Sequence, residues 1–157
     1  MVEIGSKVPR VNLVNTELKQ VEISGASSGK PTVIAFFPGA FTSVCTKEMC
    51  TIRDNISGLG GVKARVYAIS VDGPFANKAF KEHNKLEFEL LSDYRRDAVR
   101  AFGVELNDFA HLSGYTAAKR AVFITDSSGT IRYKWVSDDP TVEPKYDEIA
   151  QKLKELK

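Results

Sequence analysis

The chain has little of several features that would indicate a specialised class of protein. It contains two cysteines, two histidines and one tryptophan in 157 residues, and no block of like charge. Its 22 basic and 20 acidic residues leave a net charge of +2, which argues against nucleic acid or an anionic membrane as the main partner. No run approaches the roughly 20 apolar residues of a membrane-spanning helix, and residues 1–9 show no signal-peptide pattern. We therefore expect a cytoplasmic protein that does not bind a membrane.

What the chain does contain is typical of a globular protein with one core. Its 43% hydrophobic and 27% charged residues are ordinary proportions, and this length suits a single domain over residues 1–157. The expected elements are a hairpin (11–23), a strand (32–37), a helix (from 42 or 43), a strand (65–71), a helix (from 74), a strand (88–91), a short helix (98–102), an irregular loop (107–118), a hairpin (121–136) and a helix (from 142). This order predicts an α/β, thioredoxin-like fold with a mixed central sheet flanked by helices and an N-terminal β-hairpin extension.

Both cysteines lie in one stretch, residues 36–50, where a buried strand gives way to a helix. Cys45 would stand near the helix N-terminus, where free backbone N–H groups and the helix dipole stabilise a thiolate. The apolar stripe of this helix contains Cys45, Met49, Ile52 and Ile56. Taken alone, Cys45 would therefore be interpreted as a small buried apolar residue. Because Cys50 falls off the stripe and the Thr42 hydroxyl lies one turn earlier, we favour a reactive thiol at Cys45 with Cys50 as its partner.

The spacing of the two cysteines limits how they can react with each other. In an intact α-helix, residues five apart are separated by about 7.5 Å along the axis and 140° around it, or roughly 8.6 Å between Cα atoms. A disulfide needs Cα atoms closer than about 7 Å. A Cys45–Cys50 disulfide therefore either never forms or requires the first turns of the helix to unwind.

A metal site at the cysteines is a less favoured interpretation. Their spacing does not match the usual zinc patterns, and neither His83 nor His111 is clustered with them. We expect a protein with no metal and no organic cofactor.

The residues around Cys45 resemble the active-site motif of the peroxiredoxins. The motif reads Pro38-x-x-x-Thr42-x-x-Cys45, and Glu48 three residues later strengthens the match. The strand expected near residues 121–125 is preceded by Arg120, in a segment that is similar to the strand carrying the active-site arginine of the family. The resemblance covers nearly the whole chain.

The branch within the family is indicated by two further features. Cys50 resembles the resolving cysteine that the bacterioferritin-comigratory-protein, or peroxiredoxin Q, branch carries on the same helix. Residues 37–42 are also similar to the peroxiredoxin 5 branch. Thr125 departs from the family pattern, in which an aliphatic residue is more usual.

The resemblance implies a thiol-dependent peroxidase that reduces hydrogen peroxide and alkyl hydroperoxides. Cys45 would be the nucleophile and become a sulfenic acid, which Cys50 would attack to form an intramolecular disulfide. A thioredoxin- or glutaredoxin-like dithiol would reduce that disulfide. The protein would be a monomer or a homodimer, because an intramolecular resolving cysteine does not need a second subunit.

The same resemblance implies roles for four residues around the thiol. Arg120 would stabilise the thiolate and the developing oxyanion, and Glu48 would position that arginine. Thr42 would orient the peroxide, while Pro38 would exclude water and shield the sulfenic acid. Taken singly, each residue has an ordinary alternative as a helix cap, a strand end or a surface charge.

Two other functions are considered beside the peroxidase. A thioredoxin-type dithiol–disulfide oxidoreductase would carry C-x-x-C and a proline just before the strand at 121–125, but residues 113–120 contain no proline. A copper-delivery protein of related fold would need a shorter cysteine spacing and a committed histidine, for which His111 is the candidate. Neither function explains Pro38, Thr42 and Arg120 together.

The helix geometry makes a prediction about the oxidised protein. Because a Cys45–Cys50 disulfide cannot span an intact helix, amide hydrogen exchange of residues 44–54 should be faster after oxidation than in the reduced protein. Mass-spectrometric exchange of both forms measures this, with the final helix as an internal control. Equal protection of residues 44–54 in the two forms would contradict the prediction.

Overall fold

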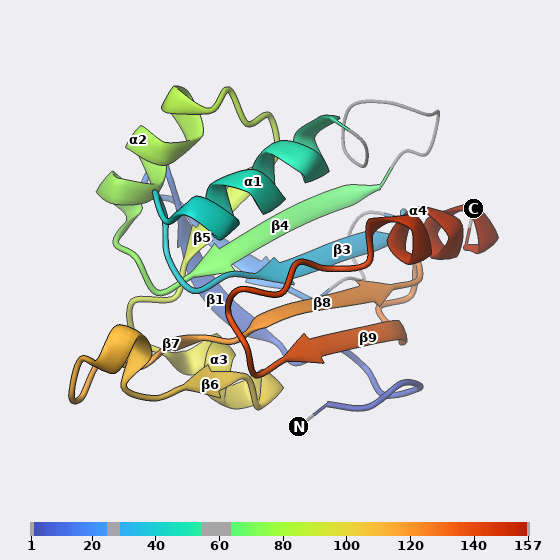
Figure 1. Ribbon diagram of the computed structural model, residues 1–157. Coiled ribbons are helices and arrows are strands. Elements are labelled where there is room, and N and C mark those ends of the chain that lie inside the picture. Colours follow the sequence, from blue (N-terminus) through green and yellow to red (C-terminus); the bar gives the residue numbers. More distant parts are fainter. Residues whose placement is uncertain (1, 25–28, 55–63, 157) are drawn as a thin grey trace.

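The computed structural model describes residues 2–24, 29–54 and 64–156, and these residues form a central sheet with helices on both faces (Figure 1). Within these ranges seven strands follow the order β2-β1-β5-β4-β3-β8-β9. Their bounds are β1 (Val11–Asn15), β2 (Gln20–Ile23), β3 (Thr32–Phe36), β4 (Arg65–Ser70), β5 (Glu89–Ser92), β8 (Arg120–Thr125) and β9 (Ile131–Ser137). Because β3 is parallel to β4 and antiparallel to β8, the sheet is mixed, as predicted.

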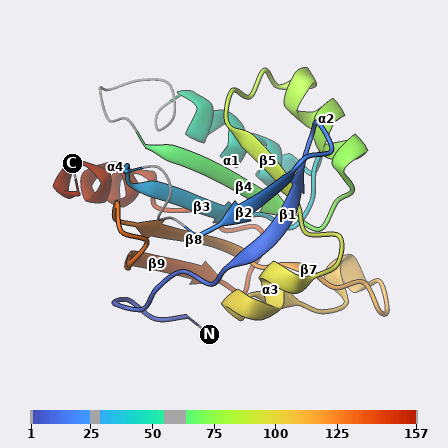
Figure 2. The same ribbon diagram turned by 180° about the vertical axis from the view of Figure 1, so that it is seen from behind.

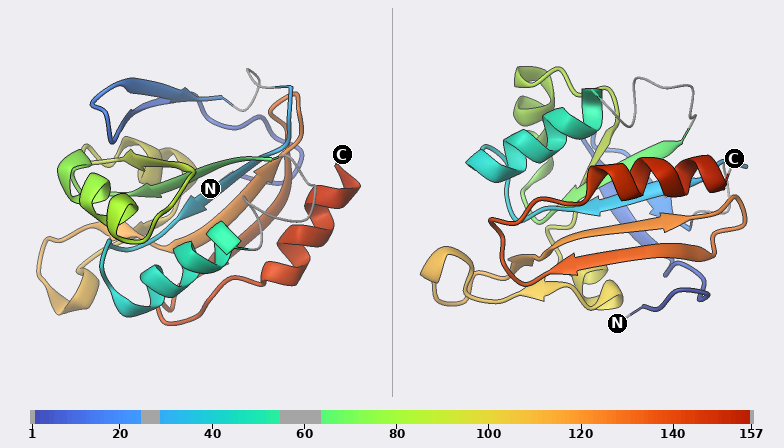
Figure 3. Two further views of the ribbon diagram at one scale, coloured as in Figure 1. Left: turned by 90° about the horizontal axis from the view of Figure 1, so that it is seen from above. Right: turned by 45° about the vertical axis from the view of Figure 1, so that its right-hand side comes forward.

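The helices divide between the two faces of the sheet. They are α1 (Ser43–Ile52), α2 (Pro74–His83), α3 (Asp97–Phe102) and α4 (Tyr146–Glu155). Buried residues of α1, α2 and α4 pack on one face of the sheet, whereas α3 and the β1–β2 hairpin pack on the other. Figure 2 and Figure 3 show the hairpin lying on the side of the sheet opposite to α1 and α4.

The apolar sequence of the central strand β3 follows from the burial of this strand on both faces. Alternate side chains of a strand point to opposite faces, so Val33 and Ala35 pack under the α1 side while Ile34 and Phe36 pack under α3 and the hairpin. All five residues of β3 are buried. The strand is therefore a rigid base from which the next residues, 37–42, pass directly into α1.

The N-terminal hairpin is attached to the main sheet by a short ladder. β1 pairs antiparallel with β2 over four positions, and with β5 only through Val14–Ser92 and Asn15–Leu91. Its inward side chains Leu13 and Ile23 are buried against the α3 side of the core. The predicted extension is thus part of the core and also an edge of the sheet.

Two predicted elements differ from the structure. The loop expected at 107–118 contains a short 3-10 helix, Phe109–His111, and its end forms β7 (Ala117–Ala118), which pairs with β6 (Glu105–Leu106). The last helix begins at Tyr146 and not at residue 142. Pro144 disfavours helical geometry in the residue before it, so residues 138–145 stay outside the helix. Among the described residues no helix has the length and apolarity needed to cross a bilayer.

Three phenylalanines on the hairpin side of the sheet provide a test of this packing. The ring centroid of Phe102 lies 5.0 Å from that of Phe36 and 5.1 Å from that of Phe123. Phe102→Ala should lower the free energy of unfolding by about 3 to 5 kcal/mol, because it removes a fully buried ring. Phe75→Ala, at an exposed phenylalanine, is the matched control and should change it by less than about 0.5 kcal/mol. Urea unfolding measures both free energies. A loss for Phe102→Ala as small as that for Phe75→Ala would contradict the expected contribution of Phe102 to the core.

Candidate active site

The connection between β3 and α1 is held in place by its neighbours on the sheet. The backbone N–H of Ala40 donates to Asp72 Oδ2 at 2.8 Å, and Asp72 lies just beyond the end of β4. Phe41 adopts a left-handed φ of 64°, which is strained for a residue with a side chain. Its ring packs edge-on against Phe80 of α2, with centroids 5.1 Å apart. This anchored connection fixes where α1 begins.

Thr42 is the N-cap residue of α1, but its hydroxyl does not cap the helix. Its backbone is extended, and no hydrogen bond joins its side chain to the first turn. The Thr42 hydroxyl donates instead to the carbonyl of Gly39 at 2.8 Å. The ordinary alternative for Thr42, a side chain that caps the helix, is therefore not what the structure shows. Because its hydrogen is used within the connection, the hydroxyl oxygen keeps its lone pairs for an incoming donor.

Cys45 lies in the first turn of α1 with its side chain buried. Cys45, Met49 and Ile52 all face the sheet, as the apolar stripe predicted, while Ile56 lies outside the described residues. The Cys45 Sγ accepts a hydrogen bond of 3.1 Å from Nη2 of Arg120. Arg120 is the first residue of β8, whose antiparallel pairing with β3 brings it beneath α1 although it is 75 positions away in the sequence.

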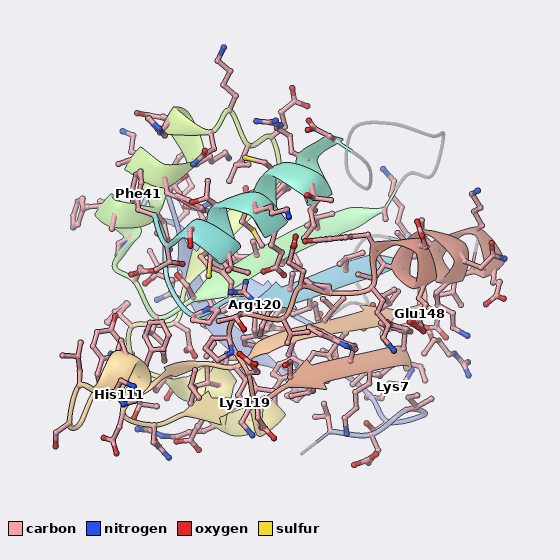
Figure 4. All side chains as sticks on the ribbon, viewed as in Figure 1. Lys7, Phe41, His111, Lys119, Arg120 and Glu148 are labelled. Carbon is pink, nitrogen blue, oxygen red and sulfur yellow. The ribbon has the colours of Figure 1, made fainter. Side chains whose placement is uncertain are left out.

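The Arg120 guanidinium is buried, and four hydrogen bonds from three nitrogens satisfy it. Besides the bond to Cys45, Nη1 donates to Oε2 of Glu48 in a buried ion pair. Nε and Nη2 both donate to the carbonyl oxygen of Pro140, at 3.1 and 2.7 Å. Figure 4 shows the Arg120 side chain between α1 and the start of β8. Pro140 could not be predicted as a partner of Arg120, because a backbone carbonyl is present at every residue.

Glu48 is buried on α1 with an unusual ionisation. Burial raises its pKa to about 7, although the nearby charge of Arg120 and its hydrogen bond oppose that shift. Within the described structure Glu48 Oε1 has no hydrogen-bond partner. Among the described residues, Arg120 is thus the hydrogen-bond partner of this carboxyl.

A second group of contacts holds residues 138–145 against α1. Glu143 accepts a hydrogen bond of 2.8 Å from the Tyr146 hydroxyl and forms an ion pair of 3.1 Å with Lys47 of α1. Burial and the bond to Glu143 raise the pKa of Tyr146 well above its usual range, so it stays a donor. These contacts keep the segment that carries the Pro140 carbonyl close to Arg120. Sequence reasoning missed the ion pair of Lys47 with Glu143, because it joins residues far apart in the chain.

The structure does not bring Cys50 to the buried site. Cys50 is half-buried on the α2 side of α1, and its thiol donates to Oδ1 of Asn84 at 3.7 Å. Both cysteines are free thiols, and α1 is continuous across them. The five-residue spacing therefore has the separating effect that helix geometry predicts.

Pro38 and His111 are the two other residues that the sequence brought into consideration. Pro38 is buried two residues after the end of β3 and lies in the same connection as Thr42. His111 is exposed at the end of the 3-10 helix, in the part of Figure 4 below α2. Among the described residues no three His, Cys, Asp or Glu side chains are grouped so as to hold a metal ion.

The raised pKa of Glu48 predicts a pH-dependent stability. The folded protein holds this proton up to about pH 7, whereas the unfolded chain releases it near pH 4.5. The resulting stabilisation is complete below about pH 4.5 and is lost as the pH rises to about 7, by up to about 3 kcal/mol. Urea unfolding across this range should show that decline in the wild type and not in Glu48→Gln. Glu155→Gln, at an exposed position, is the matched control. Parallel profiles for wild type and Glu48→Gln would refute the assignment.

Comparison with known proteins identifies relatives along nearly the whole chain. The model of the AhpC/TSA family matches residues 4–134. The thiol peroxidase of Aquifex aeolicus (strain VF5) is 33% identical over 156 residues, which is 99% of this chain and 89% of that protein. The chloroplastic peroxiredoxin Q of Gentiana triflora is 34% identical over 131 residues, or 83% of this chain, although the matched part is 58% of the plant protein.

A solved structure agrees with these sequences. The crystal structure of the peroxidoxin BcpB from Mycobacterium tuberculosis superposes with a TM-score of 0.85 at 25% identity, covering 100% of this chain and 99% of that one. The predicted thioredoxin-like peroxiredoxin fold is therefore confirmed. Fold, motif and sequence relatives agree, and the chain belongs to the AhpC/TSA family of peroxiredoxins, with its relatives in the bacterioferritin-comigratory-protein and peroxiredoxin Q branch.

Proposed function

We propose that Cys45 of this thiol-dependent peroxidase is the residue that attacks hydrogen peroxide and alkyl hydroperoxides. The observation that carries the proposal is the 3.1 Å hydrogen bond from Arg120 Nη2 to Cys45 Sγ, between two buried side chains. A guanidinium is not deprotonated in proteins, so its charge stabilises the thiolate, which is the nucleophilic form of cysteine.

The reaction is an in-line displacement at one oxygen of the hydroperoxide. The thiolate sulfur attacks the terminal oxygen, the O–O bond breaks, and Cys45 becomes a sulfenic acid. The sulfur loses two electrons to the peroxide, and the leaving oxygen takes a proton and departs as water or an alcohol. Because Arg120 is fixed by Glu48 and Pro140 before the substrate arrives, its positive charge is already placed where negative charge develops.

Two residues of the β3–α1 connection complete this site. The Thr42 hydroxyl donates to Gly39, so its oxygen is free to accept a hydrogen bond from the O–H of the hydroperoxide and orient it. The buried ring of Pro38 excludes water from one side of the sulfur and shields the sulfenic acid. Glu48 acts through Arg120 and is a positioning residue.

Cys50 is proposed to resolve the sulfenic acid. Its thiol attacks the Cys45 sulfur, a disulfide forms, and the sulfenic oxygen leaves as water with the Cys50 proton. The helical separation of the two residues requires α1 to loosen during this step. The product is an intramolecular disulfide, and its formation does not need a second subunit.

The disulfide must then be reduced by a dithiol. We propose a thioredoxin- or glutaredoxin-like partner, which would attack one sulfur and leave with its own two thiols oxidised. We infer a cytoplasmic enzyme, consistent with two free thiols, working as a monomer or homodimer in a single domain over residues 1–157. The chemistry requires no metal or organic cofactor, because cysteine supplies both electrons.

Two variants separate the proposed roles of the cysteines. Cys45→Ser should abolish turnover, because it removes the thiol that Arg120 holds in the site. Cys50→Ser should consume one equivalent of hydrogen peroxide and stop as a sulfenic acid. Thiol counting and intact mass after one equivalent of peroxide should show the wild type lighter by two hydrogens and Cys50→Ser heavier by one oxygen. Normal steady-state activity of Cys45→Ser would refute the assignment.

A further inference from the structure

A single asparagine at the end of α2 holds the part of α1 that carries Cys50. The Cys50 thiol donates to Oδ1 of Asn84 at 3.7 Å. Arg53, immediately after α1, donates from Nη1 to the backbone carbonyl of the same asparagine. The side chain and the backbone of Asn84 thus both receive hydrogen bonds from this end of α1.

Asn84 is itself fixed by its own helix. It is the C-cap residue of α2, and its backbone N–H and its Nδ2 both donate to the carbonyl of Phe80, each at 3.1 Å. With Nδ2 engaged in this way, the side-chain oxygen has one direction left and points to Cys50. The acceptor is therefore preorganised, which a freely rotating surface asparagine would not provide.

The two ends of α1 are held very differently. At the first end, Cys45 and Glu48 are tied to the buried charge of Arg120 by charge-assisted hydrogen bonds, which are the strong kind. At the other end, Cys50 has a long contact between a weak S–H donor and a neutral amide. Beyond Cys50, Arg53 also donates a charge-assisted hydrogen bond to the backbone carbonyl of Asn84. Of the two thiols, however, Cys50 has the weaker contact, so Cys50 and not Cys45 is the one that moves when the disulfide forms.

We propose that Asn84 is a positioning residue for the resolving step, a latch that retains Cys50 on α1 and so sets the rate of disulfide formation. The proposal rests on the roles proposed above for Cys45 and Cys50. The step joins the Cys45 sulfenic acid and the Cys50 thiol into a disulfide and releases one water. A thiol that donates to Asn84 is held on the α2 side of α1, away from Cys45.

The test uses two substitutions with opposite expected effects. Asn84→Ala removes the acceptor and should make disulfide formation about two- to fivefold faster, the effect of losing one weak hydrogen bond. Asn84→Asp offers a charged acceptor of similar shape, which forms a stronger hydrogen bond, so it should make the same step at least about twofold slower. General damage to the end of α2 would shift both variants in the same direction.

The measurement is rapid mixing of reduced protein with hydrogen peroxide, followed by acid quench, thiol alkylation and intact mass. Sulfenic acid formation depends on peroxide concentration and should have the wild-type rate in both variants, whereas disulfide formation is independent of that concentration. Asn12→Ala, at an exposed asparagine of β1, is the matched control and should match the wild type in both steps.

Each outcome decides the proposal. Wild-type rates of disulfide formation in both variants, or a shift of the same sign in both, would overturn the latch while leaving the peroxidase intact. If Asn84→Ala fails to fold, a slower step in Asn84→Asp supports the latch, and an unchanged or faster step overturns it. A wild type that forms no sulfenic acid, or that forms one without losing the second thiol, would refute the cysteine assignments themselves.

Discussion

A permanent positive charge buried beneath a helix is the constraint on which the rest of this site depends. Only 1% of Arg120 is exposed, so the guanidinium must be compensated inside the protein. A carboxyl of α1, a thiol of α1 and one carbonyl of the segment before α4 perform that task. The arginine thereby joins β8, α1 and the segment before α4 at one point. The positive charge of Arg120 is therefore already in position before a peroxide binds.

The helix that carries the proposed nucleophile has to satisfy two opposed demands. Met49 and Ile52 pack it against the sheet, and its first turn supports the buried ion pair. The same helix separates its two thiols by more than a disulfide permits, so the proposed resolving step requires it to give way. The contacts are graded accordingly, with charge-assisted bonds around Cys45 and a neutral contact at Cys50. The stronger contacts are therefore those at Cys45, where the proposed reaction with peroxide needs a fixed geometry.

Sequence reasoning predicted the elements whose patterns are local. The buried run of β3, the apolar stripe of α1 and the late hairpin follow from periodicity, and the sheet order brings Arg120 to Cys45 as the family motif implied. It did not predict the hydroxyl bond of Thr42, which turns back to Gly39 instead of capping the helix. Nor did it predict the contact of Cys50 with Asn84, because such a pairing depends on how α1 and α2 meet. Contacts between distant elements leave no period in the sequence.

The carbonyl of Pro140 has a consequence for how this site tolerates change. A main-chain oxygen is supplied by any amino acid, so substitution at this position retains the acceptor provided that the backbone keeps its path. Adding or removing a residue between β9 and α4 would instead shift the oxygen away from Arg120. The match to the family model ends at residue 134, before this segment. The position of this acceptor therefore depends on the length of the connection between β9 and α4, and not on which amino acids the connection contains.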